Sequence, residues 1–262
     1  MEEQQNFSRM PSQSTISPVP VSETKLIGVG DLLKKSWRIY KSRFWTFFGI
    51  VAIPLIIVFL IFVFLGFLGL ASLLALQELG FIPLLFLIVT FILIAFFAGT
   101  WPQIALLYAI KEKEQAISIV EAFKKSWRKI IPYLWISSLT GIAIFLGFIL
   151  LIIPSFIFAI WFSLSSYVFI DEDKRGFKAL SRSKQLVRGN WWQVAWRFLG
   201  LSMILMIVLL PATFILEALN ISFVSQIISL IAGPFFTIYG FLVYKDLKRI
   251  KGEGGKVNSQ LG

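Results

Sequence analysis

The chain has no cysteine and no histidine among its 262 residues. The lack of cysteine excludes a disulfide framework, a thiolate metal site and a cysteine nucleophile. The lack of histidine removes the commonest general base and the commonest metal ligand, so Ser-His-Asp triads and histidine-ligated zinc are excluded as well. Chemistry based on carboxylates remains possible, and it must be judged by where the carboxylates lie.

Charged residues are scarce, at 15% of the chain against 57% hydrophobic residues, and the mean hydropathy is +0.82. Soluble domains are only about 45–50% apolar. The composition therefore predicts an all-α, polytopic membrane protein. A transmembrane helix needs about 20 apolar residues, so the length allows about six spans with short connections.

The predicted spans cover about residues 44–68, 81–110, 131–152, 155–170, 192–216 and 223–244. Gly66 and Gly69 are expected to end the first span, and Pro154 is expected to form a tight turn before the fourth. The polar segments 1–24 and 251–262 predict disordered cytoplasmic tails, which leaves residues 25–250 as one six-span membrane domain.

The basic residues predict the orientation of these spans. The connections between spans one and two, three and four, and five and six contain no lysine or arginine, so all 25 basic residues lie toward the other side. The positive-inside rule then predicts a multi-pass protein of the bacterial cytoplasmic (inner) membrane with both termini cytoplasmic. Because the basic residues lie next to spans, the net charge of +11 indicates anionic lipid and not nucleic acid as the partner.

The pentapeptide KKSWR occurs twice, at Lys34–Arg38 and at Lys124–Arg128. Three serines each precede a tryptophan by nine residues, in the pairs Ser36 and Trp45, Ser126 and Trp135, and Ser183 and Trp192. This spacing predicts three helical hairpins of the same orientation, each led by a basic amphipathic helix, as in a parallel internal repeat. Such leader helices lie in the headgroup plane, with tryptophan at the interface and lysine reaching the phosphates.

Two local signals mark the ends of the leader helices. Ser118 and Glu121 have capping-box spacing at the start of the second, and Gly189 is expected to end the third in a left-handed conformation.

The candidate contacts to lipid headgroups or to a protein partner are the basic and tryptophan residues of the leaders. These are Lys34, Lys35, Trp37, Arg38, Lys124, Lys125, Trp127, Arg128, Arg182, Lys184 and Arg188. The alternative interpretation is that they serve only as topology signals and membrane anchors.

Polar residues inside the spans are few. Arg197 lies near the inner end of span five, where it is expected to snorkel, and no Asp, Glu or Lys lies in the middle of a span, which argues against proton-coupled transport. Gln103, next to Pro102, is the most polar mid-span side chain. It is a candidate substrate contact, or else a partner in an interhelical hydrogen bond.

Three consecutive acids, Asp171, Glu172 and Asp173, follow span four. They could bind a divalent cation, but no further converging ligands can be named. The other interpretation places them at the N-terminus of the third leader helix, where they would suit the helix dipole. The sequence predicts no catalytic residue, no metal and no cofactor.

The leader motif K-[KR]-S-W, the turn LLIIPSFIFAIWF, the acidic DED and the segment FKALSRSKQLVRGNWWQV together resemble a family. It comprises the bacterial six-span proteins grouped with the membrane domain of glycerophosphoryl diester phosphodiesterases and with YciC-like inner-membrane proteins. The catalytic barrel of those phosphodiesterases uses histidine and a metal, so the resemblance implies the membrane fold without the hydrolase.

The sequence thus predicts a non-enzymatic membrane component that binds anionic lipid or an unidentified protein partner through its basic cytoplasmic face. The alternative is a transporter of small molecules or lipids. A cavity lined by Gln103 and the Ser and Thr residues of span four would favour transport, whereas a solid Phe, Leu and Ile core would favour the first interpretation.

Overall fold

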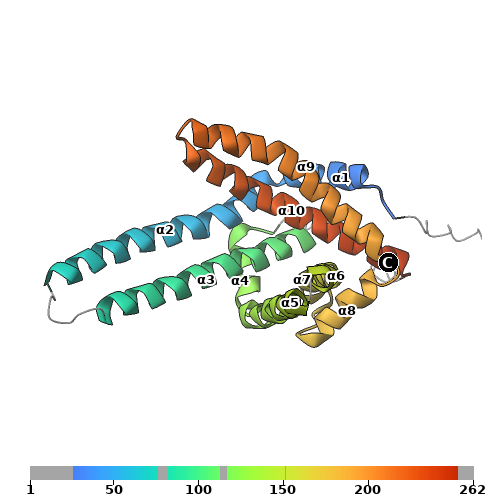
Figure 1. Ribbon diagram of the computed structural model, residues 1–262, viewed down its shortest axis with the longest axis horizontal. Helices are drawn as coiled ribbons and strands as arrows, with labels where there is room; N and C mark the ends of the chain where they lie inside the picture. The colour runs from blue at the N-terminus through green and yellow to red at the C-terminus, as the bar shows by residue number, and fades with distance from the viewer. Residues whose placement is uncertain (1–25, 76–81, 113–116, 151, 253–262) are drawn as a thin grey trace, which may run out of the picture.

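The computed structural model describes residues 26–75, 82–112, 117–150 and 152–252 (Figure 1). These residues form helices and no strand. The helices are α1 Val29–Ser42, α2 Phe44–Ala75, α3 Ile82–Lys111, α4 Ile119–Trp127, α5 Ile130–Leu150, α6 Ile152–Phe162, α7 Ser165–Glu172, α8 Phe177–Val187, α9 Trp191–Ala218 and α10 Ser222–Ile250. Six helical stretches of the described residues are long and apolar enough to cross a membrane, which confirms the predicted fold class.

Some helix ends differ from the predicted span ends. Helix α2 continues through Gly66 and Gly69 to Ala75, and α10 continues to Ile250. Pro154 does not form the turn between spans three and four, because it lies in the first turn of α6. A proline is tolerated there since the first amide groups of a helix have no intrahelical acceptor.

The predicted fourth span is not one continuous helix. The candidate span Ile152–Glu172 consists of α6 and α7, separated at residues 163 and 164. Serine hydroxyls bond carbonyl oxygens freed at the end of α6: Ser163 donates to Ile160 at 2.9 Å and Ser165 donates to Phe162 at 2.7 Å. Short-range bonds of this kind compete with the helix ladder, which explains why the cluster of serines interrupts the helix.

The long helices extend in pairs, here called arms, from one end of the molecule where the buried side chains cluster, here called the base. In Figure 1, α2 and α3 extend together to the left as one arm, and α9 and α10 extend together as another. Helices α5 and α6 pack against each other as a third pair. The buried side chains lie toward the base, whereas the outer parts of α2, α3, α5 and α9 expose many large apolar side chains. Apolar faces of this extent are compatible with an integral membrane protein, where lipid covers them.

The short helices connect the arms at the base. Helix α4 packs on α3, α8 packs on α6 and α7, and α1 packs on α10. Helices α4 and α8 therefore each contact the helical pair that precedes them in the chain. No pair precedes α1, and this helix contacts the last helix together with α2 and α9, so it connects the first helical pair to the last.

Candidate functional site

The three repeat serines occupy equivalent buried positions in the short helices α1, α4 and α8. Ser36, Ser126 and Ser183 are each fully buried. The residues four before and four after each serine are also buried, giving the triplets Leu32, Ser36 and Tyr40; Ala122, Ser126 and Ile130; and Ala179, Ser183 and Val187. The serine spacing therefore marks the inward stripe of each helix. Ser183 also donates to the Trp161 carbonyl at 2.6 Å, which connects α8 to the end of α6.

The two KKSWR copies have the same pattern of exposure. Over residues 31–40 and 121–130, each position falls in the same class of buried, partly buried or exposed. Trp37 is 58% exposed and Trp127 is 57% exposed, so the tryptophan lies outside the buried stripe in both copies. The basic residues on either side of the serine are exposed in both copies, which are Lys34, Lys35, Arg38, Lys124, Lys125 and Arg128.

These basic residues differ in whether they have acidic partners. Lys125 forms ion pairs with Glu112 at 2.6 Å and with Glu121 at 3.2 Å, and its hydrogen bond to Glu112 raises the pKa of the lysine above its usual value. Lys34, Lys35, Arg38, Lys124 and Arg128 form no ion pair within the described part of the chain. Their charges are therefore available to an anionic ligand.

The third leader, α8, presents fewer of its predicted contacts. Arg182 is turned inward, where its Nε lies 3.1 Å from a carboxylate oxygen of Glu172. Lys184 lies over the ring of Trp161 at 4.3 Å, and Arg188 remains exposed. Of the three residues predicted here, only Lys184 and Arg188 therefore face outward. The left-handed conformation expected at Gly189 is confirmed, with φ at 90°.

The capping prediction for α4 is confirmed on the serine side. Ser118 is the N-cap, and its hydroxyl accepts a hydrogen bond from the Glu121 amide at 3.2 Å. The Glu121 carboxylate instead pairs with Lys125.

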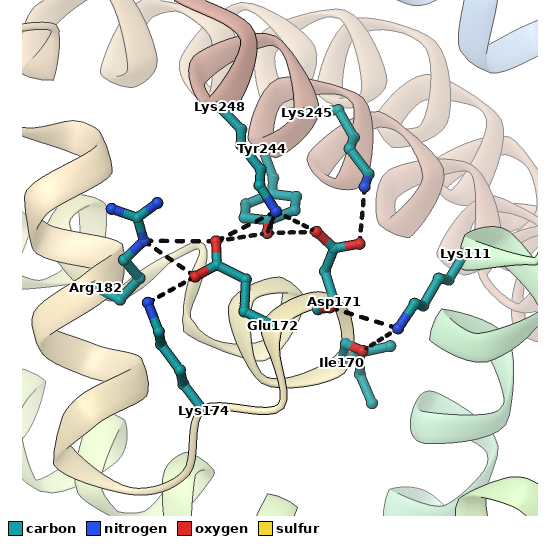
Figure 2. Close-up of polar contacts among 9 residues, drawn as sticks. All are labelled: Lys111, Ile170, Asp171, Glu172, Lys174, Arg182, Tyr244, Lys245 and Lys248. Carbon is teal, nitrogen blue, oxygen red and sulfur yellow. Dashed lines mark hydrogen bonds and ion pairs between the residues drawn. The ribbon is translucent and has the colours of Figure 1, made fainter. Parts of the chain in front are cut away.

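The acids Asp171 and Glu172 lie at the C-terminal end of α7 and not at the start of α8, so the helix-dipole interpretation was wrong. Figure 2 shows them surrounded by basic residues and a tyrosine from neighbouring helices. Asp171 binds Lys245 at 2.7 Å and Lys248 at 2.9 Å, and Glu172 binds Lys174 at 2.8 Å. The Tyr244 hydroxyl of α10 lies 2.8 Å from Asp171 and 3.0 Å from Glu172, so the two carboxylates share its single proton.

These contacts make the acidic cluster a junction between helices. Lys111, the last residue of α3, donates to the Ile170 carbonyl at 2.8 Å (Figure 2). Helices α3, α7, α8 and α10 therefore meet at Asp171 and Glu172. Both carboxylates already form ion pairs with basic side chains, so they are not free to bind a metal cation. No group of three or more acids able to hold a metal occurs among the described residues.

Asp173 is bound separately from its two neighbours. Its carboxylate pairs with Lys129, and the hydrogen bond from that lysine lowers the pKa of Asp173 below its usual value. Asp173 itself has φ at 51°, which ends α7 in a left-handed conformation.

Arg197 does not snorkel as expected, because its side chain is only 5% exposed and is paired with an acid. Its Nη2 lies 3.0 Å from Asp246, whose side chain is 1% exposed. Asp246 also accepts from the Ile27 amide at 2.9 Å and from Arg249 at 2.9 Å, and Arg197 donates to the Ile27 carbonyl. The pair thus fastens α9, α10 and the segment before α1. The role of Asp246 as the partner of Arg197 was not predicted from the sequence. The signal that could have indicated it is the single acid in the basic segment YKDLKRIK.

The polar residues considered for a transport path do not converge. Gln103 lies on an exposed face of α3, whereas Ser163 and Ser165 of the fourth span donate to carbonyl oxygens of their own segment. Ser165 also lies 3.4 Å from Thr140 of α5, a contact between packed helices.

Apolar grooves border the basic residues of the second and third leaders. Near α8 and the start of α9, a groove of about 750 Å³ is lined by Ile152, Ile153, Phe156, Ile157, Trp161, Arg188, Gly189, Trp191 and Trp192. Near α4, a basic cleft and an apolar groove share three aromatic residues, which are Trp101, Phe123 and Trp127. A basic residue beside an apolar groove has the chemistry of a phospholipid site.

Comparison with known proteins finds no matching family model, no matching curated protein and no matching solved structure. The resemblance described above therefore rests on the sequence motifs alone.

Proposed function

We propose that this chain is a non-enzymatic integral membrane protein of the bacterial cell envelope whose basic end binds anionic phospholipid headgroups. In this proposal the chain crosses the cytoplasmic membrane six times, with both termini and the three leader helices on the cytoplasmic side, where lysine and arginine concentrate. The family resemblance to six-span inner-membrane proteins is part of the same proposal.

One observation carries the proposal: two leader helices display the same basic residues, and five of these form no ion pair within the described part of the chain. Two helices far apart in the sequence bury the same serine stripe and expose the same lysines, arginine and tryptophan. A topology signal needs only basic residues near the ends of spans. Keeping Lys34, Lys35, Lys124 and Arg128 exposed in a fixed register, beside an interfacial tryptophan, suits a surface that holds anionic headgroups.

The packing favours this proposal over transport. The base is filled by apolar and aromatic side chains such as Phe47, Ile104, Phe169 and Tyr239, each no more than 1% exposed. A transport path would need polar groups converging on a cavity, and Gln103 points to the exposed face of its helix instead.

The test is lipid analysis of the protein extracted directly into native nanodiscs. The parent chain is expected to carry anionic phospholipid enriched over the surrounding membrane. A variant with Lys34→Gln, Lys35→Gln, Lys124→Gln and Arg128→Gln is expected to lose most of that enrichment, because each basic residue near the surface contributes about 1 kcal/mol. If a variant that inserts and unfolds like the parent retained the same enrichment of anionic phospholipid, the basic residues would act only as topology signals.

A further inference from the structure

The second KKSWR copy borders a cavity whose chemistry changes along its length. Beside Lys124 and Arg128 lies a cleft of about 930 Å³, and an apolar groove of about 330 Å³ lies between α2 and α3. Trp101, Phe123 and Trp127 line both spaces, so the cleft and the groove adjoin along one aromatic wall.

The aromatic wall is fixed by its own contacts. The Trp101 ring lies edge-on to Trp127 at 4.9 Å and to Phe123 at 5.1 Å, measured between ring centroids. The Trp101 indole also donates to the Phe123 carbonyl at 3.2 Å, which connects α3 to α4. The site is therefore preformed and does not depend on ordering by a ligand.

Two cations of the cleft have no acidic partner among the residues that the structure describes. Lys125 is neutralised by Glu112 and Glu121, so the charge of Glu121, the acid in the lining, is already matched. Lys124 and Arg128 form no ion pair within the described residues. Two free cations beside an aromatic wall match one phosphate group, which a guanidinium can bind in bidentate form.

The groove beyond the wall is apolar and narrow. Ile53, Ile57, Val58 and Ile61 of α2 face Ile94 of α3 across it. A second apolar groove, from Phe62 to Leu70, continues along the same two helices. Residues 53–70 rise by about 25 Å, and one membrane leaflet contributes about 15 Å of hydrocarbon, so an acyl chain has an apolar path along its whole length.

We propose that this cleft and groove bind one anionic phospholipid, with its phosphate between Lys124 and Arg128 and one acyl chain between α2 and α3. A phospholipid is assigned as the occupant because cationic side chains and an apolar groove adjoin along one aromatic wall, which matches a charged headgroup joined to an acyl chain. The assignment rests on the proposed function, which places this end of the molecule at the level of the headgroups.

The experiment is native mass spectrometry of the full chain titrated with phosphatidylglycerol, with phosphatidylcholine as the neutral lipid. The parent is expected to retain one phosphatidylglycerol more tightly than any further lipid. The variant Lys124→Gln with Arg128→Gln is expected to weaken that event by roughly thirtyfold, from two basic residues at about 1 kcal/mol each. The matched control is Lys34→Gln with Arg38→Gln, which changes the same residue types at equally exposed positions of α1 and should leave the tight event unchanged.

A second pair of variants tests the groove independently of charge. Val58→Trp fills the groove and should abolish the tight event, whereas Leu55→Trp, on an exposed face of α2 outside the lining, should not. Equal weakening by the α1 and α4 variants, or no effect of Val58→Trp, would overturn the site while leaving general headgroup binding intact. No preference for phosphatidylglycerol in the parent would refute the proposed function itself.

Discussion

Replacing Asp246 with alanine would leave the Arg197 guanidinium buried without a carboxylate. The Arg197 side chain is 5% exposed and lies 3.0 Å from Asp246, so it cannot recover its hydration without moving α9. Removing one partner of such a pair costs about 3–5 kcal/mol, most of which is the penalty of an uncompensated buried charge. We therefore expect Asp246→Ala to lower the free energy of unfolding by about that amount.

The reverse change should cost less, because Asp246 has other partners. After Arg197→Met, the carboxylate would still accept from Arg249 and from the Ile27 amide, each at 2.9 Å. The loss is then about that of hydrogen bonds to a charged group, roughly 1.5–3 kcal/mol. The double variant Arg197→Met with Asp246→Leu should be more stable than Asp246→Ala alone, since no stranded charge remains.

The free energy of unfolding in mixed micelles, followed by circular dichroism, measures all three variants under one condition. The order expected is parent, then Arg197→Met, then Asp246→Ala as the least stable. If Arg197→Met were as destabilising as Asp246→Ala, or if the double variant gave no recovery relative to Asp246→Ala, the pair would not be the buried junction described here.

Three further predictions concern other parts of the chain. Gly147→Val should destabilise the packing of α5 on α6, because a Cβ at this position would lie 2.8 Å from the Ser155 backbone. Cross-linking between the two helices would detect their separation. Unchanged cross-linking would contradict the close approach of the two helices at Gly147. The lowered pKa of Asp173 means that its pair with Lys129 stabilises the protein above the usual aspartate range and is lost as the pH falls through the lowered value. The stability difference between the parent and Asp173→Asn should thus be constant near neutral pH and shrink in acid, but it should stay below about 1 kcal/mol because the carboxylate is mostly exposed. Finally, the purified chain should not hydrolyse glycerophosphodiesters with any added divalent metal, because it has no histidine; metal-dependent turnover would refute this expectation.

The nine-residue spacing from serine to tryptophan indicated which residues of the three leader helices are structurally equivalent. It identified Ser36, Ser126 and Ser183, which the structure buries at matching positions. The leader tryptophans were predicted at the membrane interface, and Trp37 and Trp127 are exposed. Periodicity did not indicate that the serines, and not the tryptophans, lie on the stripe that packs against protein, because hydrophobicity alone cannot distinguish an apolar side chain that faces protein from one that faces the membrane interface.

The acids and Arg197 show a different limit of sequence reasoning. Asp171 and Glu172 were interpreted from their neighbours along the chain, but their partners Tyr244, Lys245 and Lys248 lie over 70 residues away. Likewise, Arg197 was expected to snorkel because it lies near the inner end of its span, but its partner Asp246 lies on another helix. A charge near a membrane edge can be satisfied either by snorkelling or by a distant acid, and local sequence does not distinguish between the two.

Composition and hydropathy by themselves determined the all-α class and the number of apolar helices, because each long helix satisfies its own backbone hydrogen bonds and its apolar surface can be read residue by residue. The position of the basic residues likewise predicted an orientation. Only the tertiary structure decided that the helical pairs meet at one base, that α1 packs on α10 and that a basic cleft adjoins an apolar groove at Trp101 and Trp127. These features depend on contacts between residues far apart in the chain, which no local pattern of charge or hydropathy specifies.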